Sequence, residues 1–225
     1  MSEDQTPPAH PLDWRGGVPV SVQFDDPFYS LENGLAEARH VFLAGNGLPG
    51  RFRDGFRIAE LGFGTGLNFV AAATAWREAG VPGRLSFTSF EAFPLAPEAA
   101  ERALSVFPDA GSCAPMVSAV LCGQGSAEAD GITLTLVRGD ARETVPAWAG
   151  EADAWFLDGF APSRNPELWE DGLMRAVAAH TAPGGTCATY SAAGTVRRAL
   201  AEAGFAVERV PGYGRKRHMT VGRLP

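Results

Sequence analysis

The sequence contains few cysteines and no long apolar run. Cys113, Cys122 and Cys187 form no C-x-x-C pair and have no nearby pair of histidines, so neither a disulfide framework nor a zinc site is predicted. No apolar stretch approaches the length that spans a membrane, and the first eight residues are acidic and polar, whereas a signal peptide is basic and then apolar. We therefore expect a soluble, cytoplasmic protein with no membrane contact and no metal site.

Positive charge is scarce except at the C-terminal end. The formal net charge of −7 argues against a general nucleic-acid binder, DNA included. From residue 191 to residue 225, however, seven Arg or Lys residues against two Glu give +5, which leaves −12 for the rest of the chain. A basic end on an acidic body is suited to directing one face toward a polyanion, although a solvated Arg-rich tail explains the charge equally well.

The 225 residues are enough for one α/β domain, and the stretch from Ile58 to Val70 organises it. A short apolar run ends at Glu60, glycines follow at 62, 64 and 66, and an apolar run from Leu67 predicts a helix. The spacing is G-x-G-x-G, not the dinucleotide fingerprint G-x-G-x-x-G. A carboxylate at Glu60 disfavours a phosphate but suits the ammonium of an amino-acid moiety, as in S-adenosylmethionine. The stretch thus favours a nucleotide-type site over a purely structural turn.

Acidic residues also follow three further predicted strands. The strand from Leu85 to Phe90 ends at Glu91, Asp140 follows a strand at 132–137, and Asp158 follows one at 152–157. Since parallel strands place their carboxyl ends at one crevice, we expect Glu91 to bind ribose hydroxyls and Asp140 to accept from the adenine amine. An ordinary turn aspartate is the alternative for Asp140. Asp158, with Phe160 beside it, is expected at the reacting centre.

Around these strands the sequence predicts a doubly wound α/β sheet of about seven strands with an antiparallel edge. Residues 1–20 are expected to form a flexible or extended arm, and the segment to residue 52 a small cap with one short helix at 35–43. Residues 53–225 are expected to form the core. The remaining predicted elements are helices at 67–79, 97–107, 167–180 and 196–203, a strand at 186–190, and a closing hairpin of 205–210 with 218–221, whereas residues 108–131 show no clear pattern.

These residues together resemble the methyltransferase domain of MnmC, a bacterial family that acts on the wobble uridine of certain tRNAs. The resemblance extends from about residue 19 to 222 and is more specific than the glycine loop alone. It rests on the following blocks: Gln23–Asp26, Asn33–Leu35, Arg39–Leu43, Gly45–Pro49, Gly62–Phe69, Trp155–Pro162 and Gly214–Arg217.

The resemblance implies a class I, Rossmann-like methyltransferase that moves a methyl group from S-adenosylmethionine to the amine of 5-aminomethyl(-2-thio)uridine at the tRNA wobble position. Many family members also carry a FAD-dependent oxidase domain, for which a chain ending at Pro225 leaves no room, so no FAD is expected and a separate enzyme is expected to supply the amine. Ala92 stands where related sequences are expected to have lysine, which removes any side-chain contribution from that position.

Residues from the glycine loop, the strand ends and the basic tail form the predicted site. Asp158 is expected to orient the amine, Phe160 to pack on the uracil, and Tyr29 to close over the site. The residues predicted to bind the cofactor are Glu60, Gly62, Phe63, Gly64, Thr65, Gly66, Asn68, Glu91, Asp140, Ala141 and Asp158, and those predicted to bind tRNA are Arg197, Arg198, Arg215, Lys216 and Arg217.

Two other functions remain open on the sequence alone. A methyltransferase of a small-molecule or protein amine suits the acidic body, although the basic tail argues against it. A non-catalytic adenosine-ligand or RNA-binding module is disfavoured because Glu60, Glu91, Asp140 and Asp158 are all present.

Overall fold

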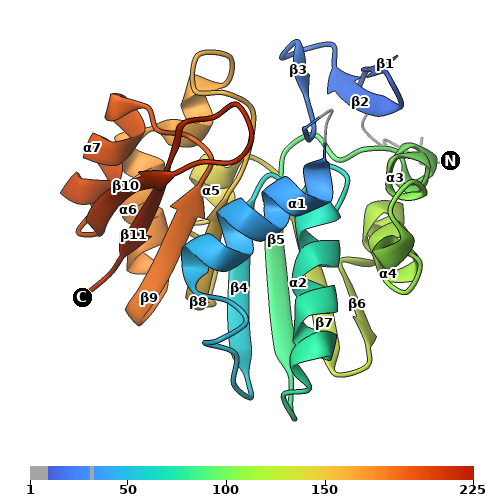
Figure 1. The fold of residues 1–225 in the computed structure, drawn as a ribbon, viewed down its shortest axis with the longest axis horizontal. Coiled ribbons are helices and arrows are strands. Elements are labelled where there is room, and N and C mark those ends of the chain that lie inside the picture. The colour runs from blue at the N-terminus through green and yellow to red at the C-terminus, as the bar shows by residue number, and fades with distance from the viewer. Residues whose placement is uncertain (1–9, 31–32) are drawn as a thin grey trace, which may run out of the picture.

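An eight-stranded sheet with the strand order β10-β11-β9-β8-β4-β5-β7-β6 forms the centre of the molecule (Figure 1). The computed structural model describes residues 10–30 and 33–225. Five neighbouring strands are parallel, and the strands at both edges are antiparallel. The strands are β4 (Phe56–Leu61), β5 (Leu85–Glu91), β6 (Ser126–Ala129), β7 (Ile132–Arg138), β8 (Ala152–Leu157), β9 (Thr181–Thr189), β10 (Ala206–Pro211) and β11 (His218–Arg223).

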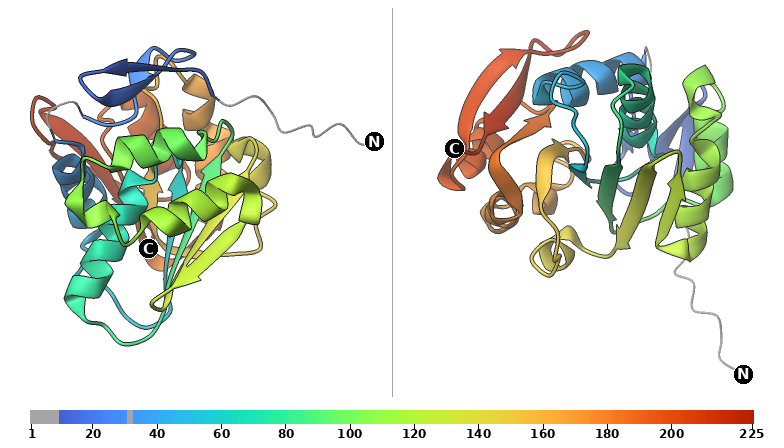
Figure 2. Two further views of the ribbon diagram at one scale, coloured as in Figure 1. Left: turned by 90° about the vertical axis from the view of Figure 1, so that its right-hand side faces the viewer. Right: turned by 90° about the horizontal axis from the view of Figure 1, so that it is seen from below.

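Helices cover both faces of this sheet (Figure 2), which confirms the predicted doubly wound fold. One face is covered by α1 (Gly34–Ala38), the π-helical turn η1 (Arg39–Leu43), α2 (Leu67–Ala79), α3 (Pro97–Leu104) and α4 (Ala114–Ala119). The other is covered by α5 (Ala141–Thr144), α6 (Asp171–Ala179) and α7 (Gly194–Glu202). Shorter turns are η2 (Ala44–Asn46), η3 (Pro108–Ala110), η4 (Val120–Gln124) and η5 (Pro166–Trp169).

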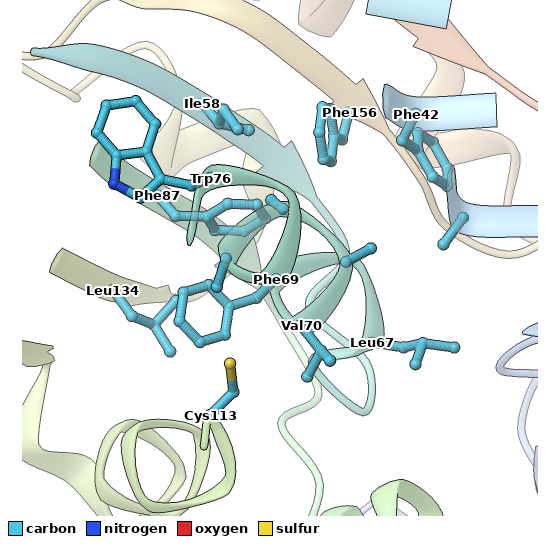
Figure 3. Close-up of a cluster of buried hydrophobic side chains, with 14 of the residues drawn as sticks. Phe42, Ile58, Leu67, Phe69, Val70, Trp76, Phe87, Cys113, Leu134 and Phe156 are labelled. Carbon is cyan, nitrogen blue, oxygen red and sulfur yellow. The ribbon is translucent and has the colours of Figure 1, made fainter. Parts of the chain in front are cut away.

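The central strand β8 is apolar except for Asp153, because it buries side chains on both faces of the sheet. In β8, Phe156 belongs to the α2 side and Trp155 to the α6 side, and all six residues of the strand are buried. Figure 3 shows the larger cluster, in which the Phe156 ring lies 5.4 Å from Phe42 and 5.8 Å from Phe87. This packing anchors η1 and α2 on the sheet and holds the carboxyl end of β8 in place.

A second, three-stranded antiparallel sheet lies at the carboxyl ends of the central strands (Figure 1). It consists of β1 (Leu12–Arg15), β2 (Val18–Ser21) and β3 (Asp26–Pro27). Residues 1–20 were expected to form a flexible or extended arm without a regular element; instead, residues 12–20 belong to a β-hairpin, and residues 1–9 lie outside the described residues. Gly16 and Gly17, with φ of +58° and +83°, form the tight turn of a hairpin, and Pro19 is accommodated within β2.

The structure also corrects several element boundaries. Strand β9 begins at Thr181 and passes through Pro183-Gly184-Gly185, which were expected to separate a helix from the strand; a register shift against β8 absorbs the irregularity. The helix predicted at 167–180 is η5 followed by α6, and the helix predicted at 97–107 ends at Leu104. The unassigned region 108–131 contains η3, α4, η4 and β6, and β6 is the eighth strand.

Because Phe156 is fully buried between Phe42 and Phe87, Phe156→Ala should lower the free energy of unfolding by about 3–5 kcal/mol. Urea unfolding monitored by circular dichroism measures this change. Val106→Ala, which truncates a side chain that is 62% exposed, is the control and should change stability by less than about 0.5 kcal/mol. Equal effects of the two substitutions would contradict the packing described above.

Candidate active site

The loop between β4 and α2 forms the floor of a cavity at the carboxyl ends of the parallel strands. Gly62, Gly64 and Gly66 have φ of +79°, +53° and +81°, which side chains rarely adopt. A Cβ atom at Gly62 would lie 3.2 Å from the Asp158 carbonyl oxygen, and one at Gly64 would lie 3.0 Å from the Phe28 ring. The glycines therefore let the loop after β8 and the N-terminal sheet approach the loop closely.

A buried amide joins two of the predicted acids. The side-chain nitrogen of Asn68, in the first turn of α2, donates to Glu60 Oε1 at 2.9 Å and to Asp158 Oδ2 at 2.7 Å. Glu60 also accepts from the Ser89 hydroxyl at 2.6 Å. Burial raises the pKa of Glu60 well above its ordinary value, and the nearby Asp158 charge acts in the same direction. Glu60 therefore does not face the cavity itself but helps to position the Asn68 side chain, which lines it.

Asp158 follows β8 and lines the cavity. Its Oδ1 accepts from the backbone N–H of Gly159 at 2.8 Å. Burial raises the pKa of the Asp158 carboxyl to about 6, although the Gly159 and Asn68 hydrogen bonds favour the ionised form. A carboxylate with this pKa is ionised at neutral pH and is incompletely compensated, so it attracts a cation or a hydrogen-bond donor.

Glu91, at the end of β5, connects two loops. Its Oε2 accepts from the backbone N–H of Gly64 at 3.0 Å, and its Oε1 accepts from that of Phe93 at 2.8 Å. Burial raises its pKa, while these backbone hydrogen bonds act in the opposite direction. Each carboxylate oxygen has a second lone pair, so Glu91 retains the capacity to accept from a ligand hydroxyl in the cavity that it lines.

The cavity has a volume of about 440 Å³ and brings together most of the predicted residues. The predicted residues that line it are Tyr29, Gly62, Phe63, Gly64, Thr65, Asn68, Glu91, Asp158, Phe160, Arg215 and Lys216. The predicted residues that are not in its lining are Glu60, Gly66, Asp140, Ala141, Arg197, Arg198 and Arg217.

Asp140 is engaged locally. Its side chain caps α5 by accepting from the Arg142 backbone N–H at 2.9 Å, and the Arg142 guanidinium pairs with it at 2.6 Å. This side-chain hydrogen bond lowers the pKa of Asp140. Ala141 belongs to the buried cluster beneath α5. An adenine contact at these two positions stays a prediction.

Several cavity residues were missed by the sequence prediction. Asp26 accepts from the Ala161 backbone N–H at 2.9 Å and thereby joins β3 to the loop after β8. Tyr190 donates its hydroxyl to the Gly159 carbonyl at 2.6 Å. Tyr190 comes one residue after β9. Its position could have been predicted, because residues that directly follow parallel strands line the crevice, which is how Asp158 was identified. The other missed lining residues include Phe28, Glu37 and Tyr213.

Five rings from separate segments form an aromatic cluster beside the cavity: His10, Phe24, Phe28, Phe93 and Phe160. The Phe160 ring stacks on Phe24 at 4.6 Å and meets the edge of Phe28 at 5.2 Å. Tyr29 lies outside this cluster and donates its hydroxyl to the Ala103 carbonyl at 3.1 Å, so its ring alone is available to the cavity.

The predicted basic residues divide into two groups. Lys216, in the loop between β10 and β11, pairs with Glu37 at 2.9 Å and lies 4.0 Å from the centre of the Tyr190 ring. Arg215 also lines the cavity, whereas Arg217 is exposed next to it in the chain. The second group is on α7, where Arg198 lies 3.9 Å from Glu202 and Arg197 is partly buried. The Lys216–Glu37 pair joins the hairpin to α1.

Negative groups predominate in the cavity. Four carboxylates line it, against the two cations Arg215 and Lys216. Such a lining favours a positively charged ligand and disfavours a phosphate group inside the cavity. Within residues 10–30 and 33–225, no cluster of three or more His, Cys, Asp or Glu is placed to hold a metal ion, and no helix has the length and apolar character needed to cross a membrane.

A family model and a solved structure are similar to this chain. A family model described as S-adenosyl-L-methionine-dependent methyltransferase matches residues 115–225. The solved structure of MnmC2 from Aquifex aeolicus superposes with a TM-score of 0.73 at 25% identity, over 97% of this chain and 72% of that one.

Curated relatives are more similar in sequence. The chain is 43% identical over 248 residues to the tRNA 5-methylaminomethyl-2-thiouridine biosynthesis bifunctional protein MnmC of Marinobacter nauticus, covering 100% of this chain and 38% of the relative. It is 46% identical to the protein of the same name from Pseudomonas paraeruginosa, covering 94% of this chain and 34% of the relative. The chain thus spans slightly more than a third of the length of these relatives. It belongs to the MnmC methyltransferase-domain family of S-adenosylmethionine-dependent methyltransferases.

Proposed function

We propose that this protein transfers a methyl group from S-adenosylmethionine to the primary amine of 5-aminomethyl(-2-thio)uridine at the tRNA wobble position. The observation that carries the proposal is Asp158, a partly buried carboxylate that lines an acidic cavity beside the glycine loop. A carboxylate in this position suits a substrate that enters as an ammonium ion. The relatives' name supplies the substrate class, since it describes biosynthesis of 5-methylaminomethyl-2-thiouridine in tRNA.

The cavity residues fit the proposed methyl donor. Glycines at positive φ keep the loop after β4 free of side chains, so a ligand can approach its backbone. Glu91 offers lone pairs suited to ribose hydroxyls, and the predominance of carboxylates suits a ligand that carries both a sulfonium and an ammonium. The donor, when bound, supplies an electrophilic methyl group on a cationic sulfur.

The protein itself aligns the amine with the methyl group and accepts a hydrogen bond from that amine. Methyl transfer is an in-line displacement, so holding the amine close to the methyl group with water excluded supplies most of the acceleration. An alkyl amine is mostly protonated at neutral pH and must lose a proton before its lone pair attacks. Asp158 accepts a hydrogen bond from this amine, while Asn68 and the Gly159 N–H hold the carboxylate in place.

The aromatic lining receives the base. Phe160 lines the cavity with its position set by Phe24 and Phe28, and it packs against the uracil ring in our proposal. Tyr29 covers the α3 side of the cavity. We further propose that this reaction takes place in the cytoplasm and that a separate catalytic centre supplies the aminomethyl group.

The first test of this proposal concerns the cofactor. The protein should bind S-adenosylmethionine with 1:1 stoichiometry and should not bind NAD, and Glu91→Gln should raise the dissociation constant by the order of 5- to 150-fold because ribose hydroxyls lose a charged acceptor. Isothermal titration calorimetry measures both effects. Glu143→Gln, at an exposed acid on α5, is the control. Unchanged affinity in Glu91→Gln would remove Glu91 from the ribose site.

The second test concerns Asp158. Asp158→Asn should retain affinity for S-adenosylmethionine and lose about 10²- to 10⁴-fold in single-turnover rate on tRNA, because its partner is the substrate amine. Rapid-quench assays with labelled methyl donor measure the rate. A variant that loses cofactor binding but keeps its rate at saturation would place Asp158 in the cofactor site.

The stability of Asp158→Asn serves as the folding control. The pKa of Asp158 is raised from 3.8 to about 6 in the folded state, so the folded state binds more protons than the unfolded state between these pH values. Stability therefore falls as pH rises through this interval. Asp158→Asn should be more stable than the wild type at pH 7, by the order of 1–3 kcal/mol, and should lose this advantage near pH 4. A destabilised variant at pH 7 would contradict the burial effect.

The third test concerns tRNA. We propose that Arg215, Lys216 and Arg217 contact phosphates, assisted by Arg197 and Arg198. Each phosphate contact releases counterions, so replacing the first three by Ala should weaken tRNA binding and reduce the slope of log K against log salt by roughly 0.7–0.9 per contact. Filter binding at several salt concentrations measures this slope.

Lys216 also pairs with Glu37, so loss of the ion pair needs its own control. Glu37→Gln breaks the pair without removing a positive charge and should leave the salt slope unchanged. A separate Arg197→Ala/Arg198→Ala variant tests the α7 group. A well-folded triple variant with the wild-type slope would exclude the hairpin as the tRNA-binding surface.

A further inference from the structure

Phe93 is a large aromatic side chain exposed to solvent beside the candidate active site. Its side chain is 44% exposed, whereas the cluster's other phenylalanines, Phe24, Phe28 and Phe160, are less exposed. It lies in the loop between β5 and α3, two residues after Glu91, whose carboxylate accepts from the Phe93 backbone N–H. That hydrogen bond connects the loop position of Phe93 to the cavity wall.

The aromatic cluster forms a continuous path from the cavity to this exposed ring. Phe160 lines the cavity and stacks on Phe24 at 4.6 Å. The Phe93 ring lies 5.8 Å from Phe24 and 5.7 Å from His10. Ring contacts therefore extend from the cavity lining at Phe160 to the exposed ring of Phe93.

Two guanidinium groups pair with Asp25, the residue that follows Phe24. Arg164 donates to the Phe24 carbonyl at 3.1 Å and pairs with Asp25 at 2.9 Å, and Arg15 pairs with the same carboxylate at 3.2 Å. Arg15 also pairs with Asp13 at 3.7 Å, so the two guanidinium groups and the two carboxylates together carry no net charge. Because this ion-pair network adds no net positive charge beside Phe93, the contact that the exposed ring offers a single-stranded nucleic acid is base stacking, which tolerates any base.

We propose that Phe93 stacks on the base adjacent to the methylated uridine in the anticodon loop. This inference rests on the proposed function, and it names how the protein binds the nucleotide next to its target. An unstacked anticodon base presents a flat face that an exposed aromatic ring covers without reading its sequence. Phe93 thus contributes to affinity for tRNA and not to the methyl-transfer step.

The experiment compares substrates with and without the adjacent base. The substrates are an anticodon stem-loop with 5-aminomethyl-2-thiouridine at the wobble position, the same stem-loop with an abasic nucleotide on the 5′ or the 3′ side of that residue, and the free nucleoside. For the intact stem-loop, Phe93→Ala should raise KM by roughly 5- to 150-fold, the range that loss of one base–aromatic stack gives. Its kcat/KM on the free nucleoside should stay near the wild-type value, because the nucleoside has no adjacent base.

The abasic substrates isolate the contact. With the wild type, one of the two abasic stem-loops should show the same rise in KM, and Phe93→Ala should then add little to it. Phe93→Trp should retain a low KM for the intact stem-loop, whereas Phe93→Leu, which keeps apolar area but lacks a flat face, should resemble Phe93→Ala. Val106→Ala removes exposed apolar area outside the aromatic cluster and should behave as the wild type.

Each alternative gives a different result. If Phe93 only supports the fold, Phe93→Ala will impair the nucleoside and the stem-loop equally, which would overturn the inference. If Phe93 docks a protein, KM for the stem-loop will be unchanged in an active enzyme, which would also overturn it. A wild-type enzyme that binds S-adenosylmethionine but leaves the stem-loop and the nucleoside unmethylated would overturn the proposed function itself.

Discussion

The geometry of the cavity depends on the Asn68 side chain, whose amide nitrogen donates to the buried Glu60 and to the partly buried Asp158. Glu60 and Asp158 lie at the ends of neighbouring parallel strands, where two uncompensated negative charges would repel each other. Burial raises the pKa of both groups, and the Asn68 hydrogen bonds act in the opposite direction, so the shared amide favours the two ionised forms and relieves their repulsion. Since Asn68 begins α2, the same contact fixes the end of the glycine loop against β8.

Strand order explains why these groups meet at all. The neighbours β8, β4 and β5 deliver Asp158, Glu60 and Glu91 to one edge of the sheet. Loops after these strands then cross-link through backbone donors, as Glu91 does with Gly64. The acidic character of the cavity therefore has two sources: Glu91 and Asp158 come from the ends of the parallel strands, whereas Asp26 comes from β3 and Glu37 from α1. The N-terminal sheet and the β10–β11 hairpin complete its walls.

Local patterns predicted the sheet and its acids because buried parallel strands leave continuous apolar runs and end at turn residues. The sequence therefore indicated β4, β5, β7 and β8 and the residues after them. Contacts between distant segments left no such pattern: Lys216 meets Glu37 across 179 residues, and His10 reaches Phe93 only in the folded chain. The role of Asp140, unlike these distant contacts, was predictable from nearby sequence, because an Asp directly before a helix commonly caps it. It was assigned to the ligand site instead because it follows a strand.

An acidic cavity places a constraint on how a polyanion is held. Phosphates are disfavoured inside it, so a bound tRNA strand must keep its backbone at the rim while one base enters. The two rims differ: the β10–β11 loop offers Arg215 and Lys216, whereas the β5–α3 loop, on the other side of β4 in the sheet order, offers the exposed ring of Phe93. In the proposed function, charge therefore holds the strand on one side and stacking holds it on the other. The electrostatic selection of an amine-bearing base is then separate from the binding of the strand that carries it.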